Sequence, residues 1–382
     1  MFSQEELSIL CSAECYEAVK ENIGRKPTDI ALDRRIVHAA VVATQVKNLQ
    51  KCRSKLPSYY AVQAIVPTLA YEQSSSEECA LRKRLEGGSV LDLTCGLGVD
   101  AFALSKRFKR VVTIERNEAV ASVARENFRR LGAENIEVIN SSAEEYLASC
   151  TDHFDWCFSD PDRRGEKGEK LVRLEDCSPD VVALMPTLKR LADKICIKCS
   201  PLFDVDEAFR LFGNCAVETV SLGGEAKEVN IYIDGSAPRI TAVAVGVGEF
   251  SASVEERNAA KWSAQPSDLA KYRYITLPDV ALQHSRLVAA AFEDKCDVWS
   301  NNGVALSVEK PEGILGRTFE VEAIYNLDSA FKRVIKGTKA EIYRRDFPMS
   351  NSDICKRYRC SEGGKERWCF TRIGENFIVI KF

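Results

Sequence analysis

Between Ser89 and Ser200 the sequence alternates short apolar runs with segments of helical spacing. The apolar runs are SVLDLT, RVVTIE, IEVIN, FDWCFSD and KICIKCS. Parallel neighbouring strands need crossover helices, so this rhythm predicts βαβ units and a doubly wound α/β sheet of the Rossmann-like type. Three further β-rich runs follow, AVETVSL, KEVNIYID and RITAVAV. Since only Gly235 to Pro238 separate the last two, we expect these two strands to be antiparallel neighbours.

The 382 residues are enough for several domains. Apolar residues at helical spacing between Asp33 and Lys51 predict an α-helical region over residues 1–78. The alternating segment and its closing strands predict a second domain over 79–248. Polar sequence at 249–268 has the character of a linker, so 249–313 is predicted to be a linker and a small ferredoxin-like α/β module. A β-rich domain is predicted over 314–382.

Charge is distributed unevenly along the chain. Residues 314–382 contain 14 Lys and Arg against 9 Asp and Glu, whereas the whole chain has a net charge of −3. A basic surface of this kind contacts phosphate, although it also fits an ordinary soluble surface. No run approaches the ~18 apolar residues of a membrane span, and the opening MFSQEELSIL has acids where a signal peptide has bases. These features predict a cytoplasmic protein with no membrane partner.

The 15 cysteines are scattered through the sequence. In the absence of a secretory signal, this distribution favours free thiols that pack as small apolar groups. Cys196 and Cys199 have the spacing of a zinc knuckle, but no second such pair follows. We therefore predict no metal site.

The loop after the first strand contains two glycines, Gly96 and Gly98, in the sequence DLTCGLGVD. Glycines at this point let the backbone pass close to a bound ligand, although they also fit a plain strand-to-helix turn. Glu115 ends the second strand, where an acid accepts hydrogen bonds from a ribose. A nicotinamide enzyme shares that acid, but it usually carries a fuller GxGxxG, and it does not begin the loop with an acid such as Asp92. We expect Asp92 to meet a cationic or N–H partner on the ligand.

Asp92, Gly96 and Gly98, together with Glu115 and the pair Asp160-Pro161, resemble three motifs of class I S-adenosylmethionine-dependent methyltransferases. The resemblance covers about residues 79–248. It implies that the glycine loop holds the methionine part of the cofactor, Glu115 the ribose, and the region of Ser142 and Ala143 the adenine. The implied cofactor-binding residues are Asp92, Thr94, Gly96, Gly98, Asp100, Glu115, Arg116, Ser142, Ala143 and Asp160.

The stretch SDPDRRG follows the fourth strand. Residues at the carboxyl end of a parallel strand face the ligand crevice, so Asp160 and Pro161 are predicted to line the methyl acceptor. Lys198, at the end of the fifth strand, is predicted to join them as a catalytic residue. Arg163 and Arg164 are candidate substrate residues, since guanidinium groups bind phosphate as forks. Ion pairing with nearby acids is the alternative.

Cys199 and Ser200 are two further candidate substrate residues. The sequence around them is similar to the strand end of 5-methyluridine RNA methyltransferases, in which a cysteine attacks the pyrimidine. Such a role requires an exposed Cys199 whose pKa is lowered by a neighbour such as Lys198. The alternative is a small side chain that fills the strand end.

Several stretches resemble a narrower family, the bacterial methyltransferases that end in a THUMP-like domain. They are Tyr71–Glu77, DLTCGLGVD, DPDRR, Lys198–Pro201 with Asp204, Glu225–Glu228, Gly316–Phe319, Arg344–Pro348 and Gly363-Gly364. The resemblance implies S-adenosylmethionine as cofactor and structured RNA, either tRNA or rRNA, as partner. We thus predict an RNA methyltransferase. The alternatives are a catalytically silent RNA-binding scaffold and a small-molecule methyltransferase.

Overall fold

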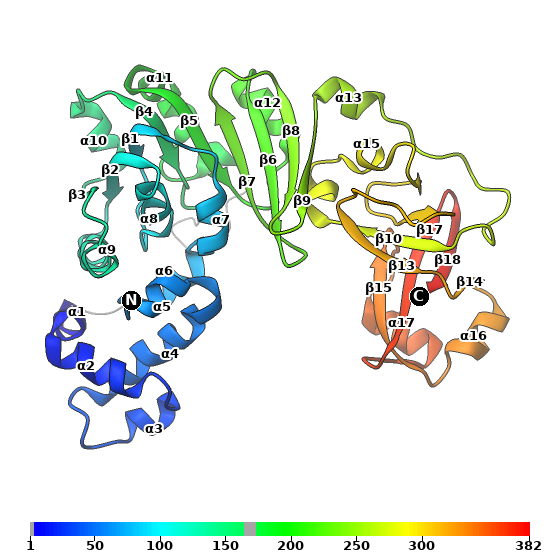
Figure 1. Ribbon diagram of the computed structural model, residues 1–382, viewed down its shortest axis with the longest axis horizontal. Helices are drawn as coiled ribbons and strands as arrows, with labels where there is room; N and C mark the ends of the chain where they lie inside the picture. Colours follow the sequence, from blue (N-terminus) through cyan, green and yellow to red (C-terminus); the bar gives the residue numbers. More distant parts are fainter. Residues whose placement is uncertain (1–3, 164–172) are drawn as a thin grey trace. The chain divides into compact units, whose positions relative to one another are not determined.

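The computed structural model of the protein describes residues 4–163 and 173–382 (Figure 1). The chain divides into two compact units. The first comprises residues 1–199 and 230–235, and the second comprises residues 200–229 and 236–382. This division falls inside the predicted 79–248 domain because strand β7 (Glu225–Ile233) contributes its beginning to one unit and its end to the other. The boundaries of the four predicted domains stay predictions.

The N-terminal region is helical, as predicted. Its helices are α1 (Gln4–Cys11), α2 (Ala13–Asn22), α3 (Pro27–Ala31), α4 (Ala39–Lys55), α5 (Pro57–Ala61), α6 (Thr68–Gln73) and α7 (Glu77–Arg82). The helix expected from Asp33 begins later, at Ala39, because His38 adopts a left-handed conformation (φ 55°) that an α-helix cannot include. In Figure 1 these helices, drawn in blue, gather beside the α/β part of the first unit.

Polar side chains join the helical region to the α/β part. Asn127 of α9 (Glu118–Leu131) hydrogen-bonds both the N–H and the C=O of Ile65, at 2.7 and 2.9 Å. Arg130 of the same helix donates to the carbonyl of Gln63 at 2.6 Å. Asn127 is fully buried, so its contacts replace hydrogen bonds that water would otherwise supply. The helical region and the α/β part therefore form one packed unit.

The α/β part of the first unit has the predicted parallel sheet. Its strands are β1 (Gly87–Asp92), β2 (Phe108–Glu115), β3 (Ile136–Asn140), β4 (Phe154–Ser159) and β5 (Ala192–Cys199), in the order β3-β2-β1-β4-β5, followed by the end of β7. The pairings among β1 to β5 are parallel. The connecting segments contain α8 (Val99–Ser105), α9, α10 (Ala143–Ser149) and α11 (Val181–Leu191), and a 3-10 turn lies at Leu174–Asp176.

The order of these strands creates a switch point. From β1 the chain runs outward to β2 and β3, and it later returns to the other side of β1 to form β4. The loops after β1 and β4 therefore diverge at the carboxyl ends of two adjacent strands, which is where open α/β sheets bind ligands. This topology is that of a class I, Rossmann-like core, as predicted.

The second unit continues with the beginning of β7, followed in order by β6 (Ala216–Leu222), β8 (Arg239–Ala244) and β9 (Gly248–Ala252). The prediction that the strands now named β7 and β8 are neighbours is wrong, because β8 pairs with β6 in parallel. The connection Asp234–Pro238 reaches about 16 Å when extended, and strands separated by one other strand lie only about 10 Å apart. A short connection can therefore pass over one strand.

The expected linker at 249–268 is also partly structured. It contains most of β9, which pairs with β8, and helix α13 (Val254–Ala259). The following elements are β10 (Tyr274–Pro278), α14 (Val280–His284), α15 (Val288–Phe292), β11 (Asp297–Val298), β12 (Ala305–Ser307) and β13 (Gly316–Glu320). They form a four-stranded antiparallel sheet in the order β11-β12-β10-β13. This arrangement differs from the βαββαβ order of the expected ferredoxin-like module.

The C-terminal part of the second unit is a five-stranded sheet with two helices. Its elements are β14 (Ala323–Asn326), α16 (Ser329–Ile335), β15 (Lys339–Arg345), α17 (Asn351–Tyr358), β16 (Ser361–Glu362), β17 (Glu366–Ile373) and β18 (Asn376–Lys381). The strand order is β14-β18-β17-β15-β16. An aromatic core around Phe331, Trp368 and Phe370 holds the helices against the sheet.

Candidate active site

Four of the predicted site residues lie at the carboxyl ends of parallel strands. Asp92 ends β1, Glu115 ends β2, Asp160 follows β4, and Lys198 is the penultimate residue of β5. The strand register places Asp92 opposite Phe158 and Ser159 opposite Ile197, so these ends lie at the same edge of the sheet. The sequence prediction that these side chains share one site is consistent with this register.

Asp92 has hydrogen-bond partners within the chain, and the ligand partner expected from the sequence stays a prediction. Its carboxylate is fully buried and accepts hydrogen bonds from the hydroxyl of Thr113 at 2.6 Å and from the backbone N–H of Thr94 at 3.0 Å. The hydroxyl of Thr94 accepts in turn from the backbone N–H of Asp160 at 2.7 Å. Asp92 and Thr94 thus tie the loop after β1 to the strand ends on either side.

The two glycines of the loop have different surroundings. Gly98 has a φ of +85°, and a Cβ there would lie 2.4 Å from Cζ of Phe128. Gly96 has a φ of +53°, and a Cβ there would meet no atom within 4 Å. Its N–H donates to the Glu115 carboxylate at 3.0 Å. Gly98 is therefore required by packing, whereas Gly96 faces open space beside the acid.

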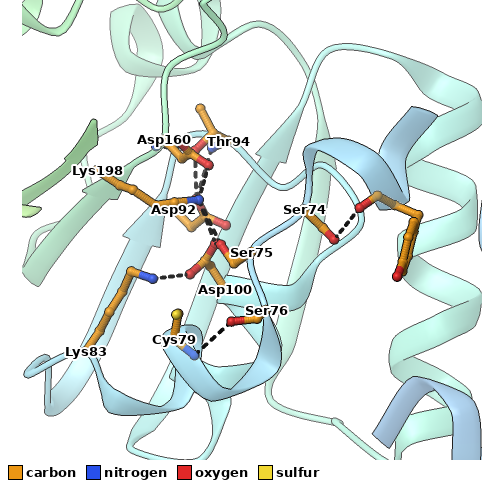
Figure 2. Close-up of polar contacts among 11 residues, drawn as sticks. Ser74, Ser75, Ser76, Cys79, Lys83, Asp92, Thr94, Asp100, Asp160 and Lys198 are labelled. Atoms are coloured by element: carbon orange, nitrogen blue, oxygen red, sulfur yellow. Dashed lines mark hydrogen bonds and ion pairs between the residues drawn. The ribbon is translucent and has the colours of Figure 1, made fainter. Parts of the chain in front are cut away.

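A network of buried charges surrounds Asp100, in the first turn of α8 (Figure 2). Its carboxylate accepts hydrogen bonds from Nζ of Lys83 at 2.7 Å and from Oγ of Ser75 at 2.6 Å. Nζ of Lys198 lies 3.7 Å from the same carboxylate and donates to Ser75 at 2.7 Å. Lys198 also forms an ion pair with Asp160. Two ammonium groups therefore balance two carboxylates in a space where Lys83 and Lys198 are almost completely buried.

The environment shifts the pKa values of the acids in opposite directions. Burial raises the pKa of Asp92 to about 7, against the hydrogen bonds from Thr113 and Thr94. Burial also raises the pKa of Glu115, opposed by the N–H groups of Asn117 and Gly96. For Asp100, burial acts in the same sense, but the charges of Lys83 and Lys198 outweigh it and hold the pKa well below its usual range. Asp100 is therefore ionised at neutral pH.

Other predicted site residues follow the ends of β2, β3 and β4. Arg116 is exposed and lies 3.5 Å from the Asp162 carboxylate. Ser142 caps α10 in a capping box with Glu145, and the next residue, Ala143, is buried. Pro161 is buried and Arg163 is half-buried, while Arg164 lies outside the described residues. The role of each in binding stays a prediction.

Cys199 does not meet the conditions set for a nucleophile. It is 2% exposed, and burial raises the pKa of its thiol above its usual value. Nζ of the adjacent Lys198 is turned to Ser75 and Asp160. The conditions for a nucleophilic Cys199 are therefore not met, and a small side chain that fills the strand end is the better description. In the second unit, Oγ of Ser200 accepts from the N–H of Leu202 at 3.2 Å and shapes the turn before α12 (Val205–Phe212).

Sequence reasoning missed Ser75, Lys83 and Thr113 as site residues. Ser75 lies in the stretch Tyr71–Glu77, whose similarity to a known family gave a signal without a role. Lys83 and Thr113 carry no signal, because a buried lysine and a strand threonine are recognisable only from what surrounds them. Tyr59 was missed as well: its hydroxyl donates to the carbonyl of Leu97 in the glycine loop at 3.1 Å.

The described chain lacks two further features. Within residues 4–163 and 173–382, no group of three His, Cys, Asp or Glu side chains is placed to hold a metal ion. In the same ranges, no helix has the length and apolar character needed to cross a membrane.

Comparison with known families identifies two domains. Residues 85–236 match the family model described as a methyltransferase domain, and residues 316–380 match the one described as THUMP domain-like. A crystal structure titled "putative methyltransferase" from Porphyromonas gingivalis W83 covers 100% of this chain and 98% of its own, with a TM-score of 0.83 and 25% identity. The fold is therefore shared along the whole chain.

Curated relatives match the methyltransferase part. The ribosomal RNA small subunit methyltransferase J of Coxiella burnetii strain RSA 331 is 32% identical over 127 residues, which cover 29% of this chain and 49% of that protein. An uncharacterized S-adenosylmethionine-dependent methyltransferase of Mycobacterium tuberculosis strain H37Rv is 27% identical over 197 residues, which cover 48% and 51%. The chain spans about half the length of these curated relatives.

Fold, strand-end acids and family match together define a class I methyltransferase domain over residues 85–236. The chain thus combines a segment that matches a methyltransferase domain with a C-terminal segment that matches a THUMP-like domain.

Proposed function

We propose that this protein is an S-adenosylmethionine-dependent methyltransferase that acts on RNA. The observation that carries the proposal is the arrangement of Gly96, Glu115, Asp160 and Lys198 at the switch point of the sheet. A loop open to a ligand, an acid that we assign to the ribose and a fixed carboxylate meet there within one packed unit.

The residues present fit the cofactor. The space beside the Gly96 Cα is free of other atoms, so a ligand can approach the backbone closely. Each carboxylate oxygen of Glu115 accepts one backbone N–H, from Gly96 or Asn117, and keeps a further lone pair for a ribose hydroxyl. Ser142 and Ala143 are assigned to the adenine. When bound, the cofactor supplies a methyl group on a positively charged sulfur.

The protein's own contribution is positioning of the methyl acceptor. We assign Asp160 to accept a hydrogen bond from an N–H or O–H group of the acceptor. Lys198 acts as a positioning residue, because its ion pair fixes the Asp160 carboxylate while Ser75 and Asp100 hold its ammonium group. Fixing both reactants in a cleft with little water is the largest advantage available to a displacement at a methyl group.

Two findings support RNA as the substrate. The methyltransferase part is similar to a ribosomal RNA methyltransferase, and the C-terminal part matches a THUMP-like model. The 14 Lys and Arg against 9 Asp and Glu in residues 314–382 give that part the charge needed for phosphate contacts. We extend the proposal to structured RNA, either tRNA or rRNA.

The first test is calorimetric titration of the full chain with S-adenosylmethionine. We expect micromolar binding that is lost in Glu115→Ala. The matched control is Glu118→Ala, which should retain binding because Glu118 is exposed in the first turn of α9. Absence of binding to a folded, ligand-free protein would contradict the enzyme proposal and favour a silent scaffold.

The second test is transfer of a labelled methyl group to RNA purified from cells that lack the protein. We expect incorporation by the wild type and a reduction of about 100-fold or more in Asp160→Asn. Incorporation into small molecules but not into RNA would contradict the RNA substrate and favour a small-molecule methyltransferase.

A further inference from the structure

The second unit contains a basic pocket that the proposed reaction does not use. Its volume is about 590 Å³, and it lies where β15 ends and β17 turns into β18. Its lining includes Gln283, Arg344, Arg345, Asp346, Arg372 and Phe377. Ligand pockets commonly have volumes of about 300–1,000 Å³, so this one is large enough for a small organic group and its polar substituents.

The positive charge of this pocket is only partly neutralised. Arg372 forms an ion pair with Asp346 at 3.0 Å. Arg345 donates to the amide oxygen of Gln283 at 3.0 Å, and Arg344 donates to the carbonyl of Met349 at 2.9 Å. Within the described part of the chain, neither Arg344 nor Arg345 has a carboxylate at ion-pair distance. Three guanidinium groups therefore share one close carboxylate.

Burial of Arg345, in contrast to the exposed Arg344, favours a bound anion. Arg345 is half-buried, and burial lowers the pKa of its guanidinium group. A charge held away from water in this way is stabilised by a counter-ion. Arginine presents planar pairs of N–H donors that match a phosphate. The pocket thus has the chemistry of a phosphate site.

Aromatic rings lie beside the guanidinium groups. Phe377 is 40% exposed, and its ring meets that of Phe347 edge to face at 5.3 Å. Phe347 is in turn packed on Phe370 at 5.3 Å, which anchors both rings to the sheet. Asp346, between Arg345 and Phe347 in the chain, has a φ of 52°. A left-handed conformation at a residue other than glycine is strained, and such strain is concentrated at binding sites.

We propose that this pocket binds one nucleotide of an unpaired RNA strand, with its phosphate on Arg344 and Arg345 and its base against Phe377. The proposal rests on RNA being the substrate of the proposed methyltransferase. Proteins bind single-stranded nucleic acid through basic grooves with aromatic rings on which bases stack. A duplex keeps its bases stacked inside the helix and is recognised mainly by shape and backbone, so a concave pocket with an exposed ring favours an unpaired nucleotide.

The test is fluorescence anisotropy of the full chain, without cofactor, with a labelled 12-nucleotide single-stranded RNA of mixed sequence. The variants are Arg344→Ala and Phe377→Ala. The matched control is Arg333→Ala, an exposed arginine of α16 in the same part of the chain and outside the pocket. We expect Kd to rise about 10-fold in each pocket variant and less than about 2-fold in the control. In Arg344→Ala the salt dependence should also fall by about one phosphate contact.

Competition experiments distinguish single-stranded RNA from duplex RNA and from free nucleotides, all of which carry phosphate and base groups. The unlabelled single strand should compete at least about 10-fold better than the same sequence in a duplex and better than adenosine monophosphate. Equal competition by the monophosphate would assign the pocket to free nucleotides and overturn the proposal. An equal loss of binding in all three variants, or no loss in the two pocket variants, would also overturn it.

The failure of this proposal is separable from failure of the proposed function. Calorimetric titration with S-adenosylmethionine should be unchanged in Arg344→Ala and Phe377→Ala, because neither belongs to the cofactor site. Loss of strand binding together with intact cofactor binding supports the pocket. Strand binding that depends on the pocket in a protein that binds no cofactor supports the pocket and contradicts the methyltransferase.

Discussion

Replacement of Gly98 by alanine tests whether the glycine loop is shaped by packing or by its ligand. The added Cβ would lie 2.4 Å from Cζ of Phe128, and Phe128 is 3% exposed in the core beneath α9. Carbon atoms in contact are normally about 3.5–4.0 Å apart, so the ring or the loop must move by about 1 Å. The same residue has a φ of +85°, which a side chain rarely adopts.

The clash with Phe128 and the positive φ each have an approximate cost in the free energy of unfolding. Overpacking of a core typically lowers the free energy of unfolding by about 1–3 kcal/mol. A left-handed conformation at alanine adds about 1–2 kcal/mol. We therefore expect Gly98→Ala to lose about 2–5 kcal/mol. In a unit of this size, that loss corresponds to a decrease in Tm of roughly 5–15 °C.

Gly96→Ala is the matched comparison, since it stands two residues away with a φ of +53° and no atom within 4 Å of the added Cβ. We expect it to lose only about 1–2 kcal/mol, the contribution of φ. It should nevertheless abolish binding of S-adenosylmethionine, because the methyl group enters the space assigned to the cofactor. Urea unfolding and calorimetric titration of both variants provide the measurements. Equal stability of the two variants, or unchanged cofactor binding in Gly96→Ala, would refute the reasoning.

Three further predictions concern the buried charges. The carboxyl of Asp92 has an unfolded pKa of about 4 and a folded pKa of about 7. The folded carboxyl therefore binds more protons than the unfolded one between these values, so its contribution to stability falls as pH rises from 4 to 7. Asp92→Asn lacks this dependence, so its free energy of unfolding relative to the wild type should rise over that range; a flat difference in denaturant unfolding would contradict the raised pKa. Lys198→Met should lose about 3 kcal/mol at pH 7, because it leaves Asp160 and Asp100 without its charge. A loss in urea unfolding no larger than the ~1 kcal/mol of a surface ion pair would argue against the buried pairs. Ser75→Ala should lose about 1.5–3 kcal/mol, since two charged groups lose a hydrogen bond, whereas Ser76→Ala removes only the cap of α7 and should lose about 1 kcal/mol. Equal losses in urea unfolding would remove Ser75 from the network.

The sequence by itself determined the features that depend on local pattern. Parallel strands and their helices follow from the period of the apolar residues, and the five apolar runs between Ser89 and Ser200 correspond to strands β1 to β5. Strand ends with Asp92, Glu115 and Asp160 could be placed at one edge because parallel strands all end on the same side of a sheet. These inferences need only the order of elements and the direction of each strand.

Only the tertiary structure decided which groups neutralise one another. Ser75 and Lys198 are 123 residues apart in the sequence, and Lys83 and Asp100 come from separate elements, so no spacing rule links them. Tertiary structure also placed β8 beside β6 and buried the thiol of Cys199. Periodicity reports the face on which a side chain lies, whereas a hydrogen bond or a pKa shift depends on atoms within a few ångströms, most of which belong to distant parts of the chain.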